Sequence, residues 1–556
     1  MSTDSNPTTT RGNRVLRFIA ALVAVLAILT AIALLWSSEG EPTDQAAPSG
    51  TAEDASRADP AASAGELAAD TASPDTGHVT EAESRSEEVS SPPASTPVPE
   101  ERDCSPRIPE DFRLTEAAPG PASVEISQAA FTCAHEVGLA FATNPPAIAT
   151  MSARGIRGPL LLVGGWFDDR LLTELRRLAP ERIVAAGFDE RILGDALTGF
   201  TVEPVAVDWE AEVPSDGRTP DVVWLVDPAK TPSSLMALGI QIGVGVVAVE
   251  GDIRAVPAYA REMIAGATRV YLLSDFEDDI TWQLEVVRRN DELPGGGLLM
   301  FGQGDGRRLV AIYGHPVTSA LGVLGEQGPE EGVERLRSIM EGYGADGSIV
   351  VPTFEIIATV ASAGAGRDGD YSSETARDVI RPWIEIAAAN DVYVVLDLQP
   401  GRTDFLTQAK IYEEFLRLPH VGLALDPEWR LKPDQVHLRQ IGTVDAAEIN
   451  RVVEWLSATV REEALPQKLL IVHQFRFSMI TNRSLIETPP ELAVLIQMDG
   501  QGSLEAKYTT WNALTLEPDA DRFWWGWKNF YDEDSPTATP DQVLELTPVP
   551  VFVSFQ

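Results

Sequence analysis

Short apolar runs recur along the C-terminal half of the chain and alternate with amphipathic segments. Runs of this length without a polar face are typical of parallel strands that are buried on both sides. The segments between them, such as 330–343, 373–390 and 445–463, carry apolar residues at helical spacing. Eight runs predict strands: Val310–Tyr313, Ser348–Phe354, Val392–Leu398, Val421–Leu425, Lys468–His473, Leu492–Met498, Phe523–Asn529 and Val551–Phe555.

Eight strand–helix units in about 250 residues predict an α/β architecture, namely a TIM-type (β/α)8 barrel over residues 307–556. The alternative is an open, doubly wound sheet. A Gly-rich phosphate motif would favour that sheet, but neither G-x-G-x-x-G nor a Walker sequence follows any of the runs. We therefore expect the barrel.

The part of the chain before the barrel also predicts strand–helix units, and it contains an internal repeat. The strand, helix and strand patterns at 158–166, 169–178 and 182–188 recur about 86 residues later, at 244–252, 257–265 and 269–275. This period is too long for a solenoid repeat. It indicates a small βα domain duplicated in tandem.

Three stretches of the first unit carry a family resemblance: Ala140–Ala149, Pro159–Val163 and Arg182–Gly187. In these stretches the chain resembles the cell-wall-binding repeats of Gram-positive surface proteins. The resemblance covers 124–207 well and 222–301 poorly, since the second unit lacks the Pro-Leu-Leu-Leu strand. It implies two flavodoxin-like units over residues 104–306 that bind a wall polymer.

The segment 18–36 contains no charged residue and is long enough, as a helix, to cross a membrane. Arginines precede it and acidic residues follow it, so residues 1–17 are expected in the cytoplasm and the rest outside. We expect an uncleaved, single-pass transmembrane anchor in the cell membrane. The alternative is a cleaved signal peptide and a secreted protein.

Residues 37–103 are rich in Ala, Ser, Pro and acidic residues, a composition that predicts a disordered linker. The formal net charge of the chain is -41, and no basic face is visible. Because phosphate binding needs such a face, nucleic acid is excluded as a partner. Cys104 and Cys133, on the exported side, predict one disulfide, with two free thiols as the alternative.

The predicted strand Val421–Leu425 ends in two carboxylates, Asp426 and Glu428. In a (β/α)8 barrel the C-terminal ends of the strands converge on the face that holds the active site. Glycoside hydrolysis requires a pair of carboxyl groups. We therefore expect Glu428 to act as the acid, with Asp499 or Asp426 as its partner. A solvated turn is the alternative interpretation of this segment.

Further polar and aromatic residues follow the other strands, and we expect them to adjust pKa values and to bind the substrate. These residues are Asp397, His473, Arg476, Gln497, Trp429, Trp527, Lys528, His315 and Glu355. Neither Cys-x-x-Cys nor His-x-His spacing occurs, so we expect neither a metal nor another cofactor.

At the level of the fold, the predicted barrel resembles barrel glycoside hydrolases and related barrels of actinobacterial surface proteins. Together these expectations describe a membrane-anchored, extracytoplasmic protein of the cell envelope. Its expected partner is a cell-wall glycan or another polysaccharide, on which it acts as a hydrolase. The alternative is a non-catalytic protein that binds wall polymer or polysaccharide.

Overall fold

The computed structural model describes residues 102–556 except 109–111, 113, 117, 209–219, 232–238, 240–242, 274–275, 277–279 and 303–305. The expected cytoplasmic segment, transmembrane anchor and nearly all of the linker therefore lie outside the described residues. Within the described part, no helix has the length and apolar character needed to span a bilayer. A disulfide joins Cys104 and Cys133.

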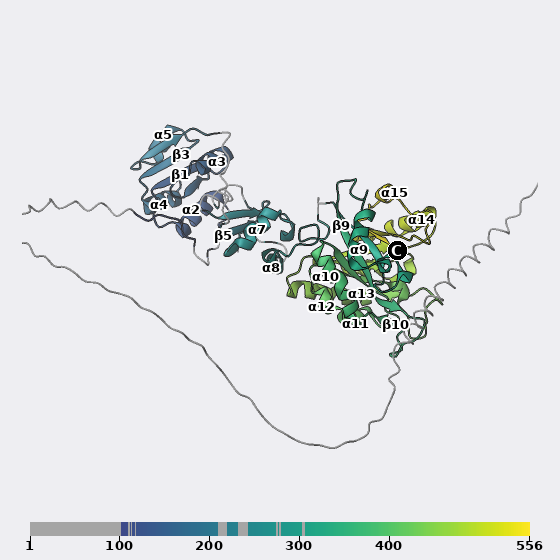
Figure 1. The fold of residues 1–556 in the computed structure, drawn as a ribbon. Coiled ribbons are helices and arrows are strands. Elements are labelled where there is room, and N and C mark those ends of the chain that lie inside the picture. Colours follow the sequence, from purple (N-terminus) through teal and green to yellow (C-terminus); the bar gives the residue numbers. More distant parts are fainter. Residues whose placement is uncertain are drawn as a thin grey trace, which may run out of the picture. The chain divides into compact units, whose positions relative to one another are not determined.

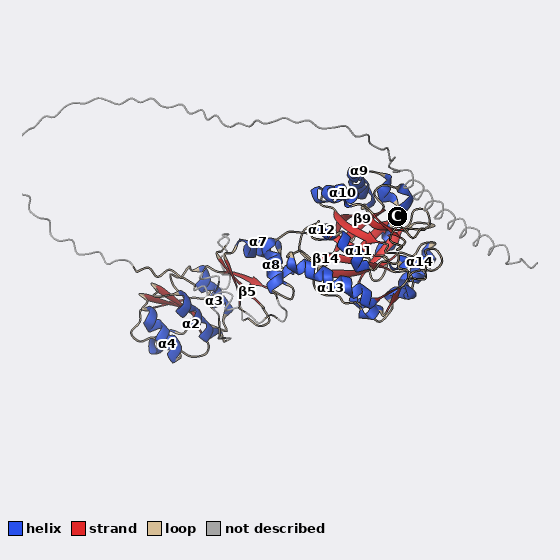
Figure 2. Ribbon diagram, turned by 90° about the horizontal axis from the view of Figure 1, so that it is seen from below, coloured by secondary structure: helices blue, strands red, loops and turns tan. Residues whose placement is uncertain are grey.

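Eight parallel strands of the C-terminal half close into a barrel, because the last strand pairs with the first. Figure 2 shows these strands in red with helices around them. In their order around the barrel the strands are β8 (Arg307–Gly314), β9 (Ile349–Ala361), β11 (Tyr393–Leu398), β12 (Val421–Leu425), β14 (Lys468–His473), β16 (Leu492–Met498), β17 (Trp524–Asn529) and β18 (Phe552–Phe555). The prediction of a TIM-type barrel is confirmed.

Helices connect successive strands and cover the outside of the barrel (Figure 1). Several begin at a side chain that accepts a backbone N–H of the first turn, as Asp445 and Ser503 do. The helices are α9 (Pro329–Ile339), α10 (Arg377–Ala389), α11 (Phe405–Ile411), α12 (Glu413–Leu416), α13 (Ala446–Glu462), α14 (Leu504–Thr515) and α15 (Pro540–Leu544).

Shorter elements lie in the loops of this half. They are the 3-10 turns η2 (Ser319–Leu321), η3 (Val323–Glu326), η4 (Pro427–Trp429), η5 (Phe477–Met479), η6 (Arg483–Leu485) and η7 (Ala520–Arg522), and the strands β10 (Ser372–Glu374), β13 (Val444–Asp445) and β15 (Ile480–Thr481). β10 pairs antiparallel with β9, and β13 pairs with β15.

Successive side chains of each barrel strand point alternately inward and outward, which divides the core into two layers. The outward residues of β11, such as Val394 and Leu396, belong to the large cluster packed against the helices. The inward ones, Tyr393 and Val395, belong to a smaller cluster with Leu309 of β8. This alternation determines which residues at the strand ends face the barrel interior.

Two smaller parallel sheets form the N-terminal part of the described chain. The first, in the order β2-β1-β3-β4, comprises β1 (Glu136–Phe141), β2 (Leu160–Val163), β3 (Arg182–Ala186) and β4 (Val202–Val205). The second, in the order β6-β5-β7, comprises β5 (Val222–Val226), β6 (Gly245–Ala248) and β7 (Arg269–Leu272). In both sheets the first strand lies between the second and the third, which agrees with the internal repeat of the sequence.

The helices of these units are α2 (Pro119–Ala130), α3 (Pro145–Ala153), α4 (Asp169–Leu178), α5 (Glu190–Ala196), η1 (Ile253–Ala255), α7 (Ala258–Gly266) and α8 (Thr281–Arg289). α4 connects β2 to β3, and α7 connects β6 to β7, so the same strand–helix–strand unit occurs in both sheets.

Candidate functional site

Each barrel strand places a polar side chain at an inward position, within one residue of the C-terminal end in seven strands and in the middle of the long strand β9, where Glu355 is level with Tyr313. The period of two explains this, because each of these residues lies two positions after another inward residue, such as Ala311, Val395 or Ile471. All are buried, with exposed fractions of 3% or less. We call this set the polar layer: Tyr313, Glu355, Asp397, Asp426, His473, Gln497, Lys528 and Ser554.

His473 is the centre of the polar layer and contacts carboxylates on both sides of its ring. Its Nδ1 lies 3.1 Å from Oδ2 of Asp499, the residue after the end of β16. Its Nε2 lies 3.3 Å from Oε1 of Glu355 and 3.9 Å from Oδ1 of Asp397. One imidazole therefore lies among three carboxylates, which come from β9, from β11 and from the residue after β16.

Tyr313 connects two further members of the layer. Its hydroxyl donates to Oδ2 of Asp397 at 2.8 Å and accepts from Nε2 of Gln399 at 3.3 Å. The ammonium of Lys528 lies 3.3 Å from the centre of the Tyr313 ring, a cation–π contact. Tyr313 therefore binds the Asp397 carboxylate through its hydroxyl and contacts the Lys528 ammonium with the face of its ring.

A second group of carboxylates lies just after the C-terminal ends of β12 and β16. We call these residues, Asp426, Glu428 and Asp499, the carboxylate triad. One oxygen of each lies within 4.8 Å of one oxygen of the others. Glu428 lies in the turn η4, and a hydrogen bond from Gly442 N–H to the Glu428 carbonyl, at 2.7 Å, fixes its backbone. A Cβ at position 442 would lie 2.5 Å from that same carbonyl oxygen, so this loop requires glycine.

Burial and mutual repulsion keep protons on part of the triad. Burial, followed by repulsion from Asp499, raises the pKa of Glu428 to about 8. Burial, followed by repulsion from Glu428, also holds the pKa of Asp426 well above its usual value. Near neutral pH the Glu428 carboxyl is therefore mostly protonated and can donate a proton.

The imidazole behaves in the opposite way. Burial lowers the pKa of His473, but the hydrogen bond with Asp499 and then the contact with Glu355 outweigh burial and hold this pKa well above its usual value. The ring is therefore an imidazolium at neutral pH. The site therefore combines a protonated carboxyl, Glu428, with an imidazolium that is hydrogen-bonded to Asp499.

Several buried oxygens of this site have no hydrogen-bond partner among the described residues. They are Oε1 and Oε2 of Glu355, Oδ1 of Asp397, Oδ1 of Asp426, Oε1 of Gln497 and Oδ1 of Asp499. Oε1 of Glu355 and Oδ1 of Asp397 face the imidazole of His473, at 3.3 and 3.9 Å from its Nε2. Burial of polar atoms whose hydrogen bonding is incomplete costs free energy, and such a cluster indicates a functional site rather than a purely structural one.

The remaining predicted site residues are less closely connected. Gln497 donates from Nε2 to Ser554 Oγ at 3.0 Å, and Trp429 is half-buried with its ring against His437. Trp527 is fully buried and packs against Trp511, so it belongs to the core under the helices and not to an exposed sugar platform.

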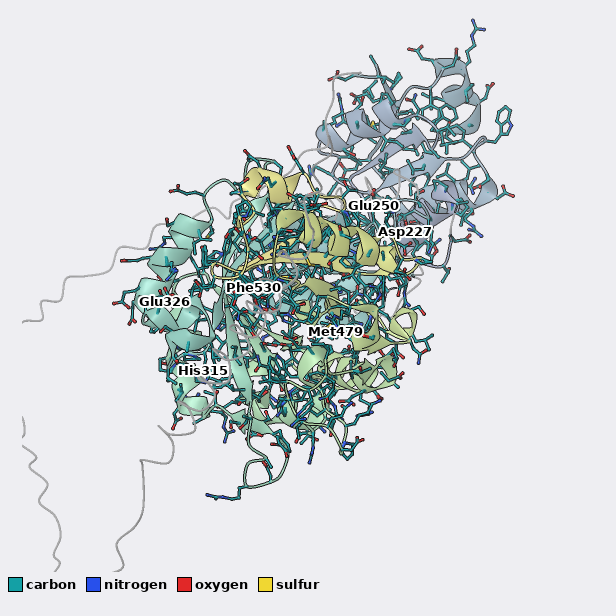
Figure 3. All side chains as sticks on the ribbon, turned by 90° about the vertical axis from the view of Figure 1, so that its right-hand side faces the viewer. Asp227, Glu250, His315, Glu326, Met479 and Phe530 are labelled. Carbon is teal, nitrogen blue, oxygen red and sulfur yellow. A yellow bond between two sulfur atoms is a disulfide. The ribbon has the colours of Figure 1, made fainter. Side chains whose placement is uncertain are left out.

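Arg476 and His315 also lie apart from the polar layer. Arg476 is exposed, with its guanidinium over the Phe475 ring. His315 lies just after β8, and its Nε2 is 2.9 Å from Thr375 Oγ1. In the view of Figure 3, His315 lies near the edge of the barrel and Phe530 further in. Burial lowers the pKa of His315 to about 4, so it is neutral.

Two members of the polar layer are absent from the sequence prediction, Tyr313 and Ser554. Both could have been found from the period of two. Leu309 and Ala311 face inward, so Tyr313, two positions later, also faces inward. The strand ends at Gly314, before His315. In the same way, Phe552 faces inward and Ser554 follows two positions later.

Among the residues that the structure describes, two groups of carboxylates have the spacing that a hard cation accepts, since Ca²⁺ and Mg²⁺ bind oxygen ligands. One is the carboxylate triad. The other is Asp368, Asp370 and Glu374, in and before β10. In the second group, both carboxylate oxygens of Asp370 already accept hydrogen bonds, from Ser372 N and from Thr403 Oγ1, each at 2.8 Å.

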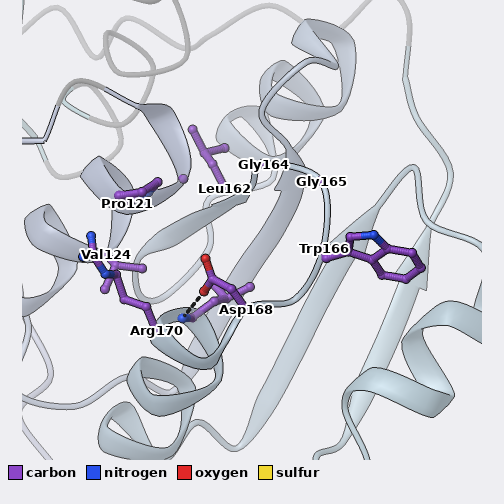
Figure 4. A pocket seen from close by; sticks show the side chains of 10 residues that line it. Pro121, Val124, Leu162, Gly164, Gly165, Trp166, Asp168 and Arg170 are labelled. Carbon is purple, nitrogen blue, oxygen red and sulfur yellow. Dashed lines mark hydrogen bonds between the residues drawn. The ribbon is translucent and has the colours of Figure 1, made fainter.

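A pocket of about 180 Å³ lies in the first N-terminal sheet unit and not in the barrel (Figure 4). It lies at the end of β2, where Gly164, Gly165 and Trp166 lead to Asp168, which caps α4 by accepting from Leu171 N at 2.8 Å. Trp166 is 80% exposed and points away from the rest of the lining. None of the residues expected in the site lines this pocket.

No family model matches the chain, and no curated protein matches it. Among solved structures, Cwp6 from Clostridium difficile matches with 14% identity and a TM-score of 0.17. The match covers 69% of this chain and 65% of Cwp6, so the chain spans less than two thirds of that protein. At this level of similarity the match supports no argument about fold or function.

Proposed function

We propose that this protein is a glycan hydrolase of the cell envelope, with its active site at the C-terminal end of the barrel. Glu428 donates the proton to the glycosidic oxygen, and Asp499 is the second carboxyl group. The observation that carries the proposal is the position of these two groups, with an oxygen of Glu428 within 4.8 Å of an oxygen of Asp499. The raised pKa of Glu428, about 8, supports its role as the acid.

This spacing favours a retaining reaction. In retaining glycosidases the two carboxyl groups lie about 5 to 5.5 Å apart, whereas inverting enzymes need about 6.5 to 9.5 Å to admit a water. Asp499 has one oxygen bonded to His473 and the other, Oδ1, without a partner. In this proposal Oδ1 attacks the anomeric carbon, while the hydrogen bond with His473 holds the carboxylate in place.

The reaction then proceeds in two steps. Glu428 protonates the leaving oxygen as Oδ1 of Asp499 forms an ester bond to the anomeric carbon and the glycosidic bond breaks. In the second step the ionised Glu428 takes a proton from water, and that water cleaves the ester. Asp426 stays neutral and can donate a hydrogen bond, since its pKa is held well above the usual value by burial and by Glu428.

An extracytoplasmic location is part of the proposal and rests on the sequence. The apolar segment 18–36, with arginines before it and the acidic linker after it, supports an anchored protein whose barrel faces the wall. The N-terminal sheet units, through their resemblance to cell-wall-binding repeats, support a wall polymer as the partner.

The second candidate is a barrel that binds a glycan without cleaving it. The burial of Asp426 and Asp499 favours this candidate, because their side chains are only 3% and 7% exposed. Catalysis requires that a sugar ring reach these oxygens, so a buried triad suits a structural role if no opening of the loops occurs.

Reducing-end release from peptidoglycan and other wall glycans separates the two candidates. We expect release by the wild type, loss of release in Glu428→Gln, and unchanged release in the matched control Glu454→Gln, an exposed position on α13. Lack of release by the wild type on a broad glycan panel, together with binding, would leave the non-catalytic role as the better account.

A further inference from the structure

Lys507 is a lysine of α14 that is completely buried outside the polar layer. Its ammonium donates to the carbonyl of Lys528 at 2.6 Å and forms an ion pair with Asp534. It also lies over the rings of Trp527 and Phe530, 4.8 and 5.3 Å from their centres. Burial of a lysine costs free energy unless its ammonium is paired, so this side chain is held at one set of partners.

Asp534 joins the loops that follow two neighbouring barrel strands, β16 and β17. One of its carboxylate oxygens accepts from Gly502 N–H at 2.9 Å, in the loop between β16 and α14. The other accepts from Phe530 N–H at 3.0 Å, directly after β17, and from the Lys507 ammonium. A second bond between the two loops runs from Ser535 N–H to the Gly502 carbonyl at 3.3 Å. The buried pair therefore connects both loops with α14.

Both of these strands end at groups of the candidate site. Asp499 directly follows β16, and Lys528 is the inward residue of β17 whose carbonyl Lys507 binds. Burial lowers the pKa of Lys507, although Asp534 and, after it, Asp499 counteract this, so Asp499 lies within electrostatic range. After burial, the same two site groups have the next largest effects on the pKa of Glu428: Asp499 raises it and Lys528 lowers it.

We propose that Lys507 is a positioning residue for the proposed reaction and that it acts by fixing Asp499 and Lys528 relative to Glu428. This inference rests on the proposed function. A displacement of about 1 Å in a reacting group can lower a rate about 100-fold. Asp499 has to reach the anomeric carbon while Glu428 donates its proton, so the placement of the loop that begins at Asp499 determines the rate. Lys507 itself makes no bond to the substrate.

The alternative is that the buried pair serves only the stability of the barrel, and the chain contains a matched control for it. Lys468 is also completely buried, and its ammonium donates to the carbonyls of Leu418 and Val421 at 2.6 and 2.7 Å. It lies at the start of β14, at the opposite end of the barrel from the candidate site. Lys507→Met and Lys468→Met therefore remove the same buried group, but only the first does so beside the site.

The first measurement is reducing-end release by the full protein, with the wild type and both variants compared at equal concentrations of folded protein. We expect Lys507→Met to lower kcat about 10- to 100-fold with little change in KM, because the substrate still binds while the reacting groups are misplaced. The alkaline limb of its pH profile should move to lower pH, since a displaced Asp499 raises the pKa of Glu428 less. Lys468→Met should lower the thermal unfolding temperature and leave kcat and the pH profile unchanged.

The second measurement does not require hydrolysis. In urea unfolding, the stability gained through Glu428→Gln at high pH should be smaller in the Lys507→Met background than in the wild type, because Asp499 then repels Glu428 less. The same gain should be unchanged in the Lys468→Met background. If Lys507→Met does not fold, Asp534→Asn, which has nearly the shape of the native side chain, replaces it in both measurements.

An unchanged kcat and pH profile in Lys507→Met overturn the inference and leave the proposed hydrolase intact. Additivity of Lys507→Met with Glu428→Gln also overturns it, as does an equal departure from additivity for Lys468→Met, since the buried pair then serves stability alone. If the wild type releases nothing from any glycan, the proposed function falls, and the second measurement decides whether Lys507 positions the carboxylate triad.

Discussion

Replacing Glu428 by Gln should stabilise the protein at high pH, because burial and the neighbouring carboxylates disfavour the ionised form of this side chain. Its pKa rises from 4.5 in the unfolded chain to about 8 in the folded protein. Between these values the folded state binds more protons than the unfolded state, so the free energy of unfolding falls as pH rises. The Gln side chain is neutral at every pH, so the variant does not lose this part of its free energy of unfolding as pH rises.

The magnitude follows from the shift. Each pKa unit corresponds to about 1.4 kcal/mol, so the complete shift sets an upper limit of about 5 kcal/mol. Glu428 is partly exposed, and its neighbours can take up protons as it ionises. We therefore expect a gain of about 2 kcal/mol at pH 9 and of less than about 1 kcal/mol at pH 5.

The assay is urea unfolding of the wild type, Glu428→Gln and Glu454→Gln at both pH values, followed by the fluorescence of the barrel tryptophans. Glu454 lies exposed on α13 and should show no pH-dependent difference. An equal effect of Glu428→Gln at pH 5 and pH 9, or a loss of stability that grows with pH, would refute the electrostatic reasoning.

Three further predictions concern the same site. Hydrolysis should decline as pH rises through about 8, where Glu428 loses its proton; a rate still rising at pH 9 contradicts this. His473→Gln should lower kcat about 100-fold and move the pH profile, while circular dichroism stays native. Gly526→Ala should cost about 1 to 3 kcal/mol in thermal unfolding, since its Cβ would lie 1.9 Å from Gln497 Oε1, whereas Gly194→Ala meets open space and should be harmless.

The barrel could be predicted from sequence because its signal is local. Each strand is a short run that is apolar on both faces, and each such run in the C-terminal half became a barrel strand. Closure follows from the number of runs and from the absence of phosphate motifs. The ends of seven strands were placed to within one residue, which was sufficient to bring Asp397, Asp426 and His473 together. The exception is β9, which was expected to end at Phe354 and continues to Ala361 because its last residues pair with β10.

The details of the site depend on side-chain direction, which a list of strand ends does not contain. His315 and Trp527 both lie near strand ends, but neither is in the polar layer. β8 ends at Gly314, before His315, and Trp527 is one of the outward positions of β17. Lys528, one position later, faces inward. The sequence prediction left Asp499 and Asp426 open as the partner of Glu428, and in the structure one oxygen of each lies within 4.8 Å of one oxygen of Glu428.

The direct test of the central claim, that Glu428 is the proton donor, is the dependence of the rate on the leaving group. An acid catalyst matters for a sugar leaving group and becomes dispensable for a dinitrophenolate, which leaves without a proton. With the sugar that the glycan panel identifies, we predict that Glu428→Gln loses most activity on the natural linkage and retains most of it on the dinitrophenyl glycoside. Equal losses on both substrates, or no loss on the natural linkage, would contradict the assignment.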